Sequence, residues 1–320
     1  GSTGYGVASS AGSYNDYYIY RNNTSLYNYR KGLDAHEGDH ILIENNVSYG
    51  DRLLGIAVYN RSYKMENAII RNNVVTQDTN NRLLKNDLRK DGTFSAGSDY
   101  SQYEAIHLQT NEKGRDLSQD TSVGYFEISG NTIKNLDNSG KISVKYDSGF
   151  RAEENYTTNA ILVRMQEPYL DYVLKIDNNK ISGNSATSIF KVINSAIDHK
   201  NHNLQVAETE KFKTGIGYGS GAVSITNNKV DVDTVRGFAA TSLNPIQIVE
   251  TTDNRFIRDT QSKITTFQDK FRGSVNFSNN EINFKNTELS SERNSESALK
   301  IISNAEAIVM KGNKLNFGNF

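Results

Sequence analysis

The chain has 320 residues, a formal net charge of -1, and neither cysteine nor tryptophan. The near-neutral charge gives no general basic field for nucleic acid or an anionic membrane, and the lack of cysteine excludes disulfides, thiol catalysis and thiolate metal ligands. No apolar run approaches the roughly 18 residues that a membrane-spanning helix needs. We therefore expect no nucleic acid and no membrane among the partners.

An alternating apolar segment returns along the chain, each time running into an Asn pair or Gly-Asn and then resuming with an apolar residue. Clear copies lie at 40–47, 67–74, 126–133, 174–181, 223–230, 275–282 and 308–315, with weaker copies at 19–26 and 250–257. The second Asn residues of successive copies are separated by roughly 25 or roughly 50 residues. A separation of roughly 25 residues indicates a single coil, and one of roughly 50 indicates two coils or one coil with an inserted loop. The period-2 alternation of Ile, Val, Phe and Tyr favours strands over helices.

The recurring Asn has a physical reason at the end of each strand. Asn tolerates the left-handed backbone conformation and can hydrogen-bond its own turn. Stacked Asn side chains in successive coils can also form amide ladders. This combination resembles the right-handed parallel β-helix of the pectate lyase-like superfamily, over most of residues 15–320. The resemblance implies an all-β fold, a right-handed single-stranded parallel β-helix (a solenoid) with long loop insertions.

The ends of the chain indicate a fragment of a longer protein. Residues 1–4 look like an expression scar or linker, and residues 5–320 are expected to form a single parallel β-helix domain. Solenoids need caps over their terminal coils. Phage tail spikes, which the Asn-rich coils resemble, meet this need by trimerising and by flanking domains. That resemblance implies a homotrimer or flanking domains, and a place outside the cell or on the virion tail.

A second apolar strand precedes several of the Asn-bearing strands. These segments lie at 32–38, 55–61, 104–110, 159–165, 187–193, 244–250 and 297–303. Aligning their apolar alternation predicts an inward face that contains Leu33, Ala35, Ile56, Val58, Ile106, Leu108, Ile161 and Val163. The residues between them must point outward.

On the outer face the same alignment predicts three columns of stacked residues. The columns are Asp34, Ala57 and Ala105; His36, Tyr59 and His107; and Gly38, Arg61 and Gln109, which Arg164 extends from a neighbouring coil. Adjacent coils lie about 4.8 Å apart, so neighbours in a column can reach one sugar or phosphate unit. The alternative is that a solenoid in water must place polar residues outside in any case.

The segment Asp34-Ala35-His36-Glu37, followed one coil later by Gly55 to Val58 and Arg61, resembles mannuronan C-5 epimerases over about residues 32–61. That family carries an Asp-Pro-His-acid motif on one coil and, in its periplasmic members, an Arg on the next. The resemblance implies a catalytic His36, with Asp34 beside it and Arg61 neutralising the sugar carboxylate.

The chain departs from that family at two positions. Ala35 replaces the family's Pro, and Lys31 stands where secreted members place a Tyr, so proton donation would fall to Tyr59 or Lys31. Proton abstraction next to a carboxylate needs a cation, a base and an acid for the leaving oxygen. Arg61, His36 and Tyr59 can supply these, which favours a polysaccharide lyase over an epimerase.

Reactions of other classes can use the same outward residues. A hydrolase needs two carboxylates about 5 to 9 Å apart, and Asp34, Glu37 and Glu104 are available. A phosphodiester polymer such as teichoic acid would use His36 and His107 as base and acid. A glycan-binding adhesin without catalysis and a structural shaft are further alternatives.

We therefore expect binding and cleavage of an anionic cell-surface polysaccharide or teichoic-type polymer. Candidate catalytic residues are His36, Arg61, Tyr59 and Asp34, and candidate substrate-binding residues are Lys31, Glu37, Glu104, His107, Gln109 and Arg164. No cofactor is expected, although the sequence leaves a Ca²⁺ requirement open.

Long polar insertions are predicted beside these outward residues, at 78–103, 110–124 and 136–158. Long ordered loops usually flank functional sites. The segment 82–91 is compatible with a short helix, but its mixed charges more often mark a solvated face. A further excursion at 198–220 contains His199 and His202, whose spacing hints at a metal site. Without a fixed acid partner nearby, a polar loop is the favoured interpretation, and no metal ligand is assigned.

Overall fold

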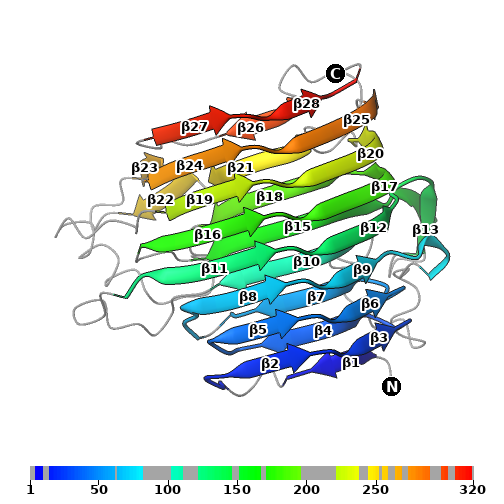
Figure 1. Cartoon of the computed structure of the whole chain (residues 1–320), viewed down its shortest axis with the longest axis horizontal. Coiled ribbons are helices and arrows are strands. Elements are labelled where there is room, and N and C mark those ends of the chain that lie inside the picture. The colour runs from blue at the N-terminus through cyan, green and yellow to red at the C-terminus, as the bar shows by residue number, and fades with distance from the viewer. Residues whose placement is uncertain are drawn as a thin grey trace.

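A computed structural model of the chain describes residues 4–9, 14–61, 63–81, 102–110, 122–145, 151–166, 171–195, 221–237, 244–251, 254–258, 264–268, 273–288, 297–301 and 307–318. These residues form strands, connecting turns and one short 3-10 helix, η1 (Thr79–Asn81). Most strands belong to three sheets of eight strands each, and every pair of neighbours in these sheets is parallel (Figure 1). The chain passes through the three sheets in turn and then repeats, an arrangement consistent with a parallel β-helix.

The sheets are called A, B and C here. Sheet A contains β1 (Tyr5–Ala8), β4 (Lys31–His36), β7 (Leu54–Tyr59), β10 (Gln102–Thr110), β15 (Thr157–Gln166), β18 (Ser188–Ser195), β21 (Ile246–Thr251) and β26 (Leu299–Ile301). Sheet B contains β2 (Tyr18–Arg21), β5 (Ile41–Glu44), β8 (Asn67–Arg71), β11 (Gly124–Ser129), β16 (Tyr172–Asp177), β19 (Gly221–Thr226), β24 (Gly273–Ser278) and β27 (Ala307–Lys311). Sheet C contains β3 (Thr24–Leu26), β6 (Val47–Tyr49), β9 (Val74–Thr76), β12 (Thr132–Leu136), β17 (Lys180–Ala186), β20 (Lys229–Arg236), β25 (Glu281–Glu288) and β28 (Lys314–Asn316).

The hydrophobic core lies between the three sheets and runs along the stack. Residues in register on successive strands of sheet A, such as Leu33, Ile56, Ile106 and Ile161, are fully buried in it. The other inward positions predicted from alternation, Ala35, Val58, Leu108 and Val163, are buried there as well. The prediction of the inward face is therefore confirmed.

The corner between sheets B and C is the most regular feature of the fold. In every coil two residues separate the strand of sheet B from that of sheet C. The first is an Asn or Gly with φ between 53° and 66°: Asn22, Asn45, Asn72, Gly130, Asn178, Asn227, Asn279 and Gly312. The second is always Asn, and its side-chain amide donates to the carboxamide oxygen of the second Asn in the next coil at 3.0 to 3.1 Å, from Asn23 through to Asn313. Both roles predicted for the Asn pairs, the left-handed turn and the amide ladder, are confirmed.

We expect the left-handed residue of a corner to tolerate Gly but not Ala. Asn178 is exposed and has φ 53°, and an L-residue with Cβ costs about 1 kcal/mol there unless it is Asn or Asp. Asn178→Ala should lower the free energy of unfolding in urea by about that amount, whereas Asn178→Gly should change it by less than about 0.5 kcal/mol. Lys180→Ala, on the exposed face two residues later, is the control. An Asn178→Ala protein as stable as the wild type would contradict this account of the corner.

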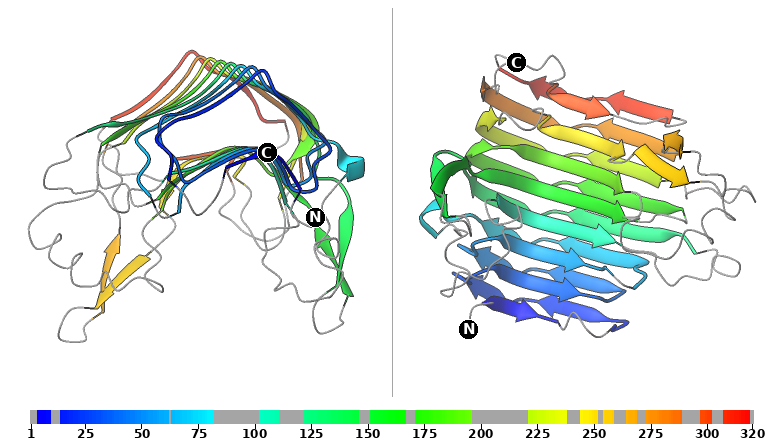
Figure 2. Two further views of the ribbon diagram at one scale, coloured as in Figure 1. Left: turned by 90° about the horizontal axis from the view of Figure 1, so that it is seen from below. Right: turned by 180° about the vertical axis from the view of Figure 1, so that it is seen from behind.

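Two hairpins stand outside the three sheets. β13 (Lys141–Lys145) pairs antiparallel with β14 (Arg151–Asn155), and β22 (Asn254–Arg258) pairs antiparallel with β23 (Ile264–Gln268). They lie at opposite sides of the body and both extend away from it on the side of sheet A (Figure 2). The segment 136–158, predicted as a polar loop, therefore includes the first hairpin.

The second hairpin corrects the repeat assignment. The weak copy at 250–257 is not a coil corner, because Asn254 begins β22 and the amide of Asn228 donates directly to Asn280. A hairpin closes its own hydrogen bonds and needs no partner in the neighbouring coils. The steps of roughly 50 residues are thus single coils with insertions rather than pairs of coils.

Some sequence predictions fall on residues outside this description. The segment 82–91, with its choice between a short helix and a solvated face, and the excursion with His199 and His202 are among them. Within the described ranges, no helix has the length and apolar character needed to cross a membrane.

Candidate functional site

The outer face of sheet A carries residues that strict alternation would turn inward. A Cβ on Gly32 or Gly55 would lie only 2.3 Å from Asp51 Oδ2 or 2.4 Å from Val75 Cγ1, so these two glycines face the interior. The residues that follow them, Leu33 and Ile56, are also in the core, as are Ala105 and Ile106 on the next strand. Two successive inward residues break the alternation, and the residue before each pair is turned to the outer face: Lys31, Leu54 and Glu104.

The outer face therefore has three columns, in a register that differs from the prediction. One column contains Lys31, Leu54 and Glu104, a second contains Asp34, Ala57 and His107, and a third contains His36, Tyr59, Gln109 and Arg164. The predicted stacking of Asp34 with Ala57, of His36 with Tyr59 and of Gln109 with Arg164 is confirmed. The placement of β10 against β7 was wrong by two residues, and Ala105 lies in the core. A slip of two residues keeps every side chain on the same face, so alternation alone could not reveal it.

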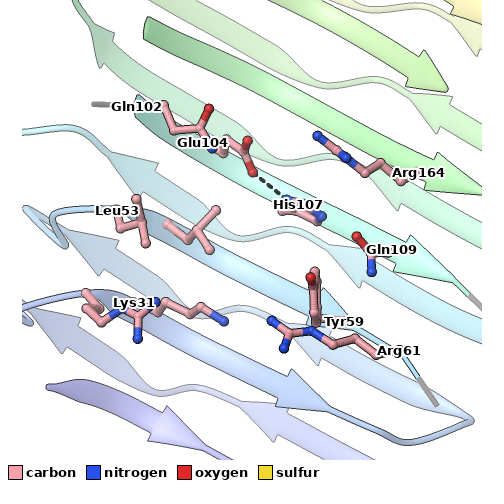
Figure 3. Close-up of a pocket in the computed structure, with 11 residues that line it drawn as sticks. Lys31, Leu53, Tyr59, Arg61, Gln102, Glu104, His107, Gln109 and Arg164 are labelled. Atoms are coloured by element: carbon pink, nitrogen blue, oxygen red, sulfur yellow. Dashed lines mark hydrogen bonds and ion pairs between the residues drawn. The ribbon is translucent and has the colours of Figure 1, made fainter. Parts of the chain in front are cut away.

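These columns surround a pocket of about 160 Å³. Its lining comes from four neighbouring coils and consists of Arg30, Lys31, Leu53, Leu54, Tyr59, Arg61, Gln102, Glu104, His107, Gln109 and Arg164 (Figure 3). Seven of the ten residues predicted for the site line it. Four of the lining residues are cationic, whereas Glu104 is the only carboxylate among them.

His107 and Glu104 form a buried pair at the centre of the pocket. The Nδ1 atom of His107 contacts Glu104 Oε2, and the two side chains are 9% and 3% exposed. A carboxylate only accepts hydrogen bonds, so the proton of a neutral His107 ring lies on Nδ1 and Nε2 keeps its lone pair. His107 Nε2 is itself buried and has no hydrogen-bond partner among the residues that the structure describes. Buried polar atoms are nearly always satisfied, so this nitrogen is available to a water molecule or a ligand in the pocket.

A second pair of this kind lies one column away. Asp34 is 1% exposed and accepts hydrogen bonds from Lys31 Nζ at 3.0 and 3.1 Å, while His36 Nδ1 lies 3.0 Å from its Oδ2 atom. Burial lowers the pKa of Lys31, and the Asp34 carboxylate opposes this effect. Asp34 and His36 do not line the pocket. The ring of His36 packs edge-on against Tyr59, with 5.1 Å between the centroids.

Tyr59 stands between the two histidines. Its ring centroid lies 5.5 Å from that of His107, and the guanidinium of Arg61 lies over its face at 4.6 Å. Lys31 Nζ also lies 5.5 Å from this centroid, so two cations reach the same ring. Figure 3 shows Lys31 and Arg61 approaching Tyr59 along neighbouring strands. Cations over a ring face are attracted by its negative π-system, which fixes their positions at the pocket.

Arg164 provides a second unsatisfied group. Its Nε atom is buried and has no hydrogen-bond partner in the described part of the chain, on the strand next to Gln109. Gln109 is held by a hydrogen bond of 3.2 Å from its Nε2 to the carbonyl of Asn60. The guanidinium of Arg164 and the imidazole of His107 thus both present unpaired nitrogen atoms in one pocket.

Glu37 has a structural place in the turn after β4. It has φ 53°, is 2% exposed and accepts a hydrogen bond of 3.1 Å from the backbone N–H of Arg61. It is absent from the pocket lining.

Comparison of the chain with protein-family models, curated proteins and solved structures found no match.

Four lining residues were missed from the sequence: Arg30, Leu53, Leu54 and Gln102. Leu53 and Leu54, at the start of β7, were a usable signal, because two adjacent apolar residues that enter a strand cannot both face the core unless the alternation breaks. Among the residues that the structure describes, no cluster of three or more His, Asp or Glu side chains could hold a metal ion.

Proposed function

We propose that this protein binds an anionic cell-surface polysaccharide in the pocket on sheet A and cleaves it by elimination. The observation that carries the proposal is the unpaired Nε2 atom of His107, held in a pocket with four cationic side chains by the contact of Nδ1 with Glu104. A carboxylate that orients a histidine leaves its other nitrogen available as a general base.

The charge of the lining supports an anionic substrate. Arg30, Lys31, Arg61 and Arg164 contribute four positive groups, of which Lys31 is paired with Asp34, and Glu104 is engaged by His107. Charges that are removed from water bind strongly only when an opposite charge meets them. A uronate carboxylate between Arg61 and Arg164 would satisfy this requirement and would accept the free Nε–H of Arg164.

The pocket contains every group that elimination from a uronate needs. His107 Nε2 takes the proton from the carbon next to the carboxylate, and the positive groups stabilise the negative charge that develops on that carboxylate. The electron pair forms a carbon–carbon double bond as the glycosidic bond breaks. The leaving oxygen takes a proton from the phenol of Tyr59. The products are one shortened chain and one chain with an unsaturated end, and no water is consumed.

The proposal includes a wider setting. The parallel sheets and the Asn ladder fit a right-handed β-helix of the pectate lyase-like kind, found among phage tail spikes and polysaccharide-degrading proteins. We place the protein outside the cell or on a virion tail, where cell-surface glycans are accessible. A homotrimer or flanking domains would cover exposed apolar side chains on the outermost strands β27 and β28, namely Ile308, Met310 and Leu315.

The purified chain should bind polyanionic glycans through Arg164. Alginate, uronic-acid capsules and teichoic acids are the probes, with dissociation constants measured by calorimetry and products followed as unsaturated ends, reducing ends and released phosphate. Arg164→Met should weaken binding of the substrate glycan about ten- to a hundredfold, the loss expected for a charged hydrogen-bonded pair. Arg236→Met is the control, since Arg236 lies on sheet C and pairs with Glu288.

Other results would lead to other conclusions. Unsaturated ends would support elimination, whereas reducing ends without unsaturation would indicate a hydrolase, and released phosphate esters would indicate a phosphodiesterase. An altered sugar configuration in an intact polymer would indicate an epimerase. Binding without any product would indicate an adhesin. Failure of every polyanion to bind would contradict the proposal as a whole.

A further inference from the structure

Two pairs of aromatic rings lie at the turns that lead from sheet A to sheet B. Tyr17 packs against His40 with 5.0 Å between ring centroids, and Tyr14 packs against Tyr63 at 5.3 Å. These four residues are called the aromatic ledge. They come from three successive coils, after β1, β4 and β7.

The ledge is open to solvent. Tyr17 is 72% exposed, Tyr63 is 39% exposed and the side chain of His40 is 45% exposed. The rings are thus not part of the hydrophobic core, and Tyr17 and His40 leave ring surface uncovered. Grouped exposed aromatic surface on a protein in water commonly marks a binding site.

Acidic groups surround the ledge, in contrast to the cationic pocket. Asp39 Oδ2 lies 3.5 Å from His40 Nδ1. Burial, followed by the charges of Asp39 and Asp16, raises the pKa of Tyr14 to about 12. Glu66 adds to this field, although Lys64 pairs with it at 3.1 Å. Asp39 is buried and its carboxylate accepts hydrogen bonds from the backbone N–H groups of the residues around it, so it acts on a bound sugar through its charge. An anionic sugar would be repelled here, whereas an uncharged sugar would not.

The ledge and the pocket are continuous along the chain. Arg61 lines the pocket and Tyr63 follows it by two positions, so their Cα atoms are at most about 7 Å apart. Glu37 also connects the two regions, because it holds the backbone of Arg61 and lies between β4 and the turn that carries His40. A polymer bound in the pocket can therefore reach the ledge with a neighbouring unit.

We propose that the aromatic ledge is a second subsite, which stacks against an uncharged sugar of the polymer whose anionic unit occupies the pocket. This inference rests on the proposed function, and it adds a substrate class. The substrate is a heteropolysaccharide in which acidic and uncharged sugars alternate, rather than a homopolymer of uronates. Stacking uses the ring faces of Tyr17 and Tyr63, and the acids of the ledge exclude a second uronate.

The test compares two defined polymers. Hyaluronan alternates glucuronate with an uncharged N-acetylated sugar, and polygalacturonate carries a carboxylate on every unit. Calorimetry should show that the wild type prefers the alternating polymer. Tyr17→Ala and Tyr63→Ala should each reduce that preference about fivefold, the effect expected for one ring contact. Tyr27→Asn is the matched control, because Tyr27 is 56% exposed in a ring pair with Tyr49 at the far corner and has φ 54°.

The two levels of the proposal can fail separately. If both polymers bind, Arg164→Met weakens both and the ledge variants leave the preference unchanged, the ledge is not a subsite but the pocket function stands. A wild type that prefers polygalacturonate would also overturn the ledge. If neither polymer nor any other polyanion binds, the ledge and the function on which it rests are both overturned. Circular dichroism of each variant verifies that the fold is retained.

Discussion

Replacing His107 with Gln should reduce turnover of the substrate glycan by about a hundredfold to ten-thousandfold, the range for losing a general base. The Gln amide can still donate to the buried carboxylate of Glu104, so the pocket keeps a partner for that charge. It has no basic nitrogen to replace the Nε2 atom that lacks a partner in the pocket. Initial rates of unsaturated-product formation and calorimetric binding are the measurements, and binding should change little.

The choice of Gln rather than Ala matters for this experiment. Glu104 is 3% exposed, and removing its partner altogether would leave a buried charge that costs about 3 to 5 kcal/mol of stability. His36→Gln serves as the comparison, because His36 contacts Tyr59 from outside the pocket lining. We expect it to lose far less activity than His107→Gln. The reverse order would assign the base to His36, as the resemblance to the epimerases implies.

Removing one amide from the middle of the Asn ladder should destabilise the protein by about 3 to 5 kcal/mol. Asn131 is fully buried, accepts from the backbone and side-chain nitrogens of Asn73, and donates to Asn179 and to the carbonyl of Ile70. Asn131→Ala leaves the backbone N–H of Asn73 buried without a partner, at about 1 to 3 kcal/mol, and removes three further hydrogen bonds at about 0.5 to 1.5 kcal/mol each. The Asn73 side chain still donates to Ile43, and the Asn179 carboxamide oxygen still accepts from the backbone at position 131. The free energy of unfolding in urea measures the effect.

The position in the ladder provides the control. Asn23 is at its first rung and only donates within it, through its backbone and side-chain nitrogens, to Asn46. Asn23→Ala keeps the backbone donor and should cost less than about 1.5 kcal/mol. Asn131→Asp should be at least as harmful as Asn131→Ala, since a carboxylate oxygen would face the carboxamide oxygen of Asn179. Equal losses for Asn23→Ala and Asn131→Ala would show that the ladder is not a cooperative element.

The sequence predicts the corners of the fold well, because their chemistry is local. The signal is a pair of adjacent residues, an Asn or Gly that can adopt positive φ and an Asn that stacks on the next coil. The corners from Asn22 to Asn313 could therefore be found without any structure. The copy at 250–257 shows the limit of that signal. Asn254 has similar neighbours but belongs to a hairpin. Only the hydrogen bond from Asn228 to Asn280 shows that no coil corner lies between them.

The outer face could be predicted only in part, because it depends on relations between coils. Alternation identified Tyr59, His107 and Arg164 as outward residues, and they meet at one pocket. It could not fix the register of β10, since a slip of two residues leaves the pattern unchanged. It also missed the break at Gly32 and Gly55, where two successive residues face the interior and the preceding side chain turns outward.

The two-residue corners between sheets B and C have a consequence for how this protein can vary. Every coil keeps that corner at the same length, whereas the connections that enter and leave sheet A range from one residue to more than twenty. Length changes are therefore confined to the rims of the face that carries the pocket. A designer could exchange a rim segment such as the β13–β14 hairpin for one from another protein and retain the spine of stacked amides. New specificities would then be accessible without building a new fold.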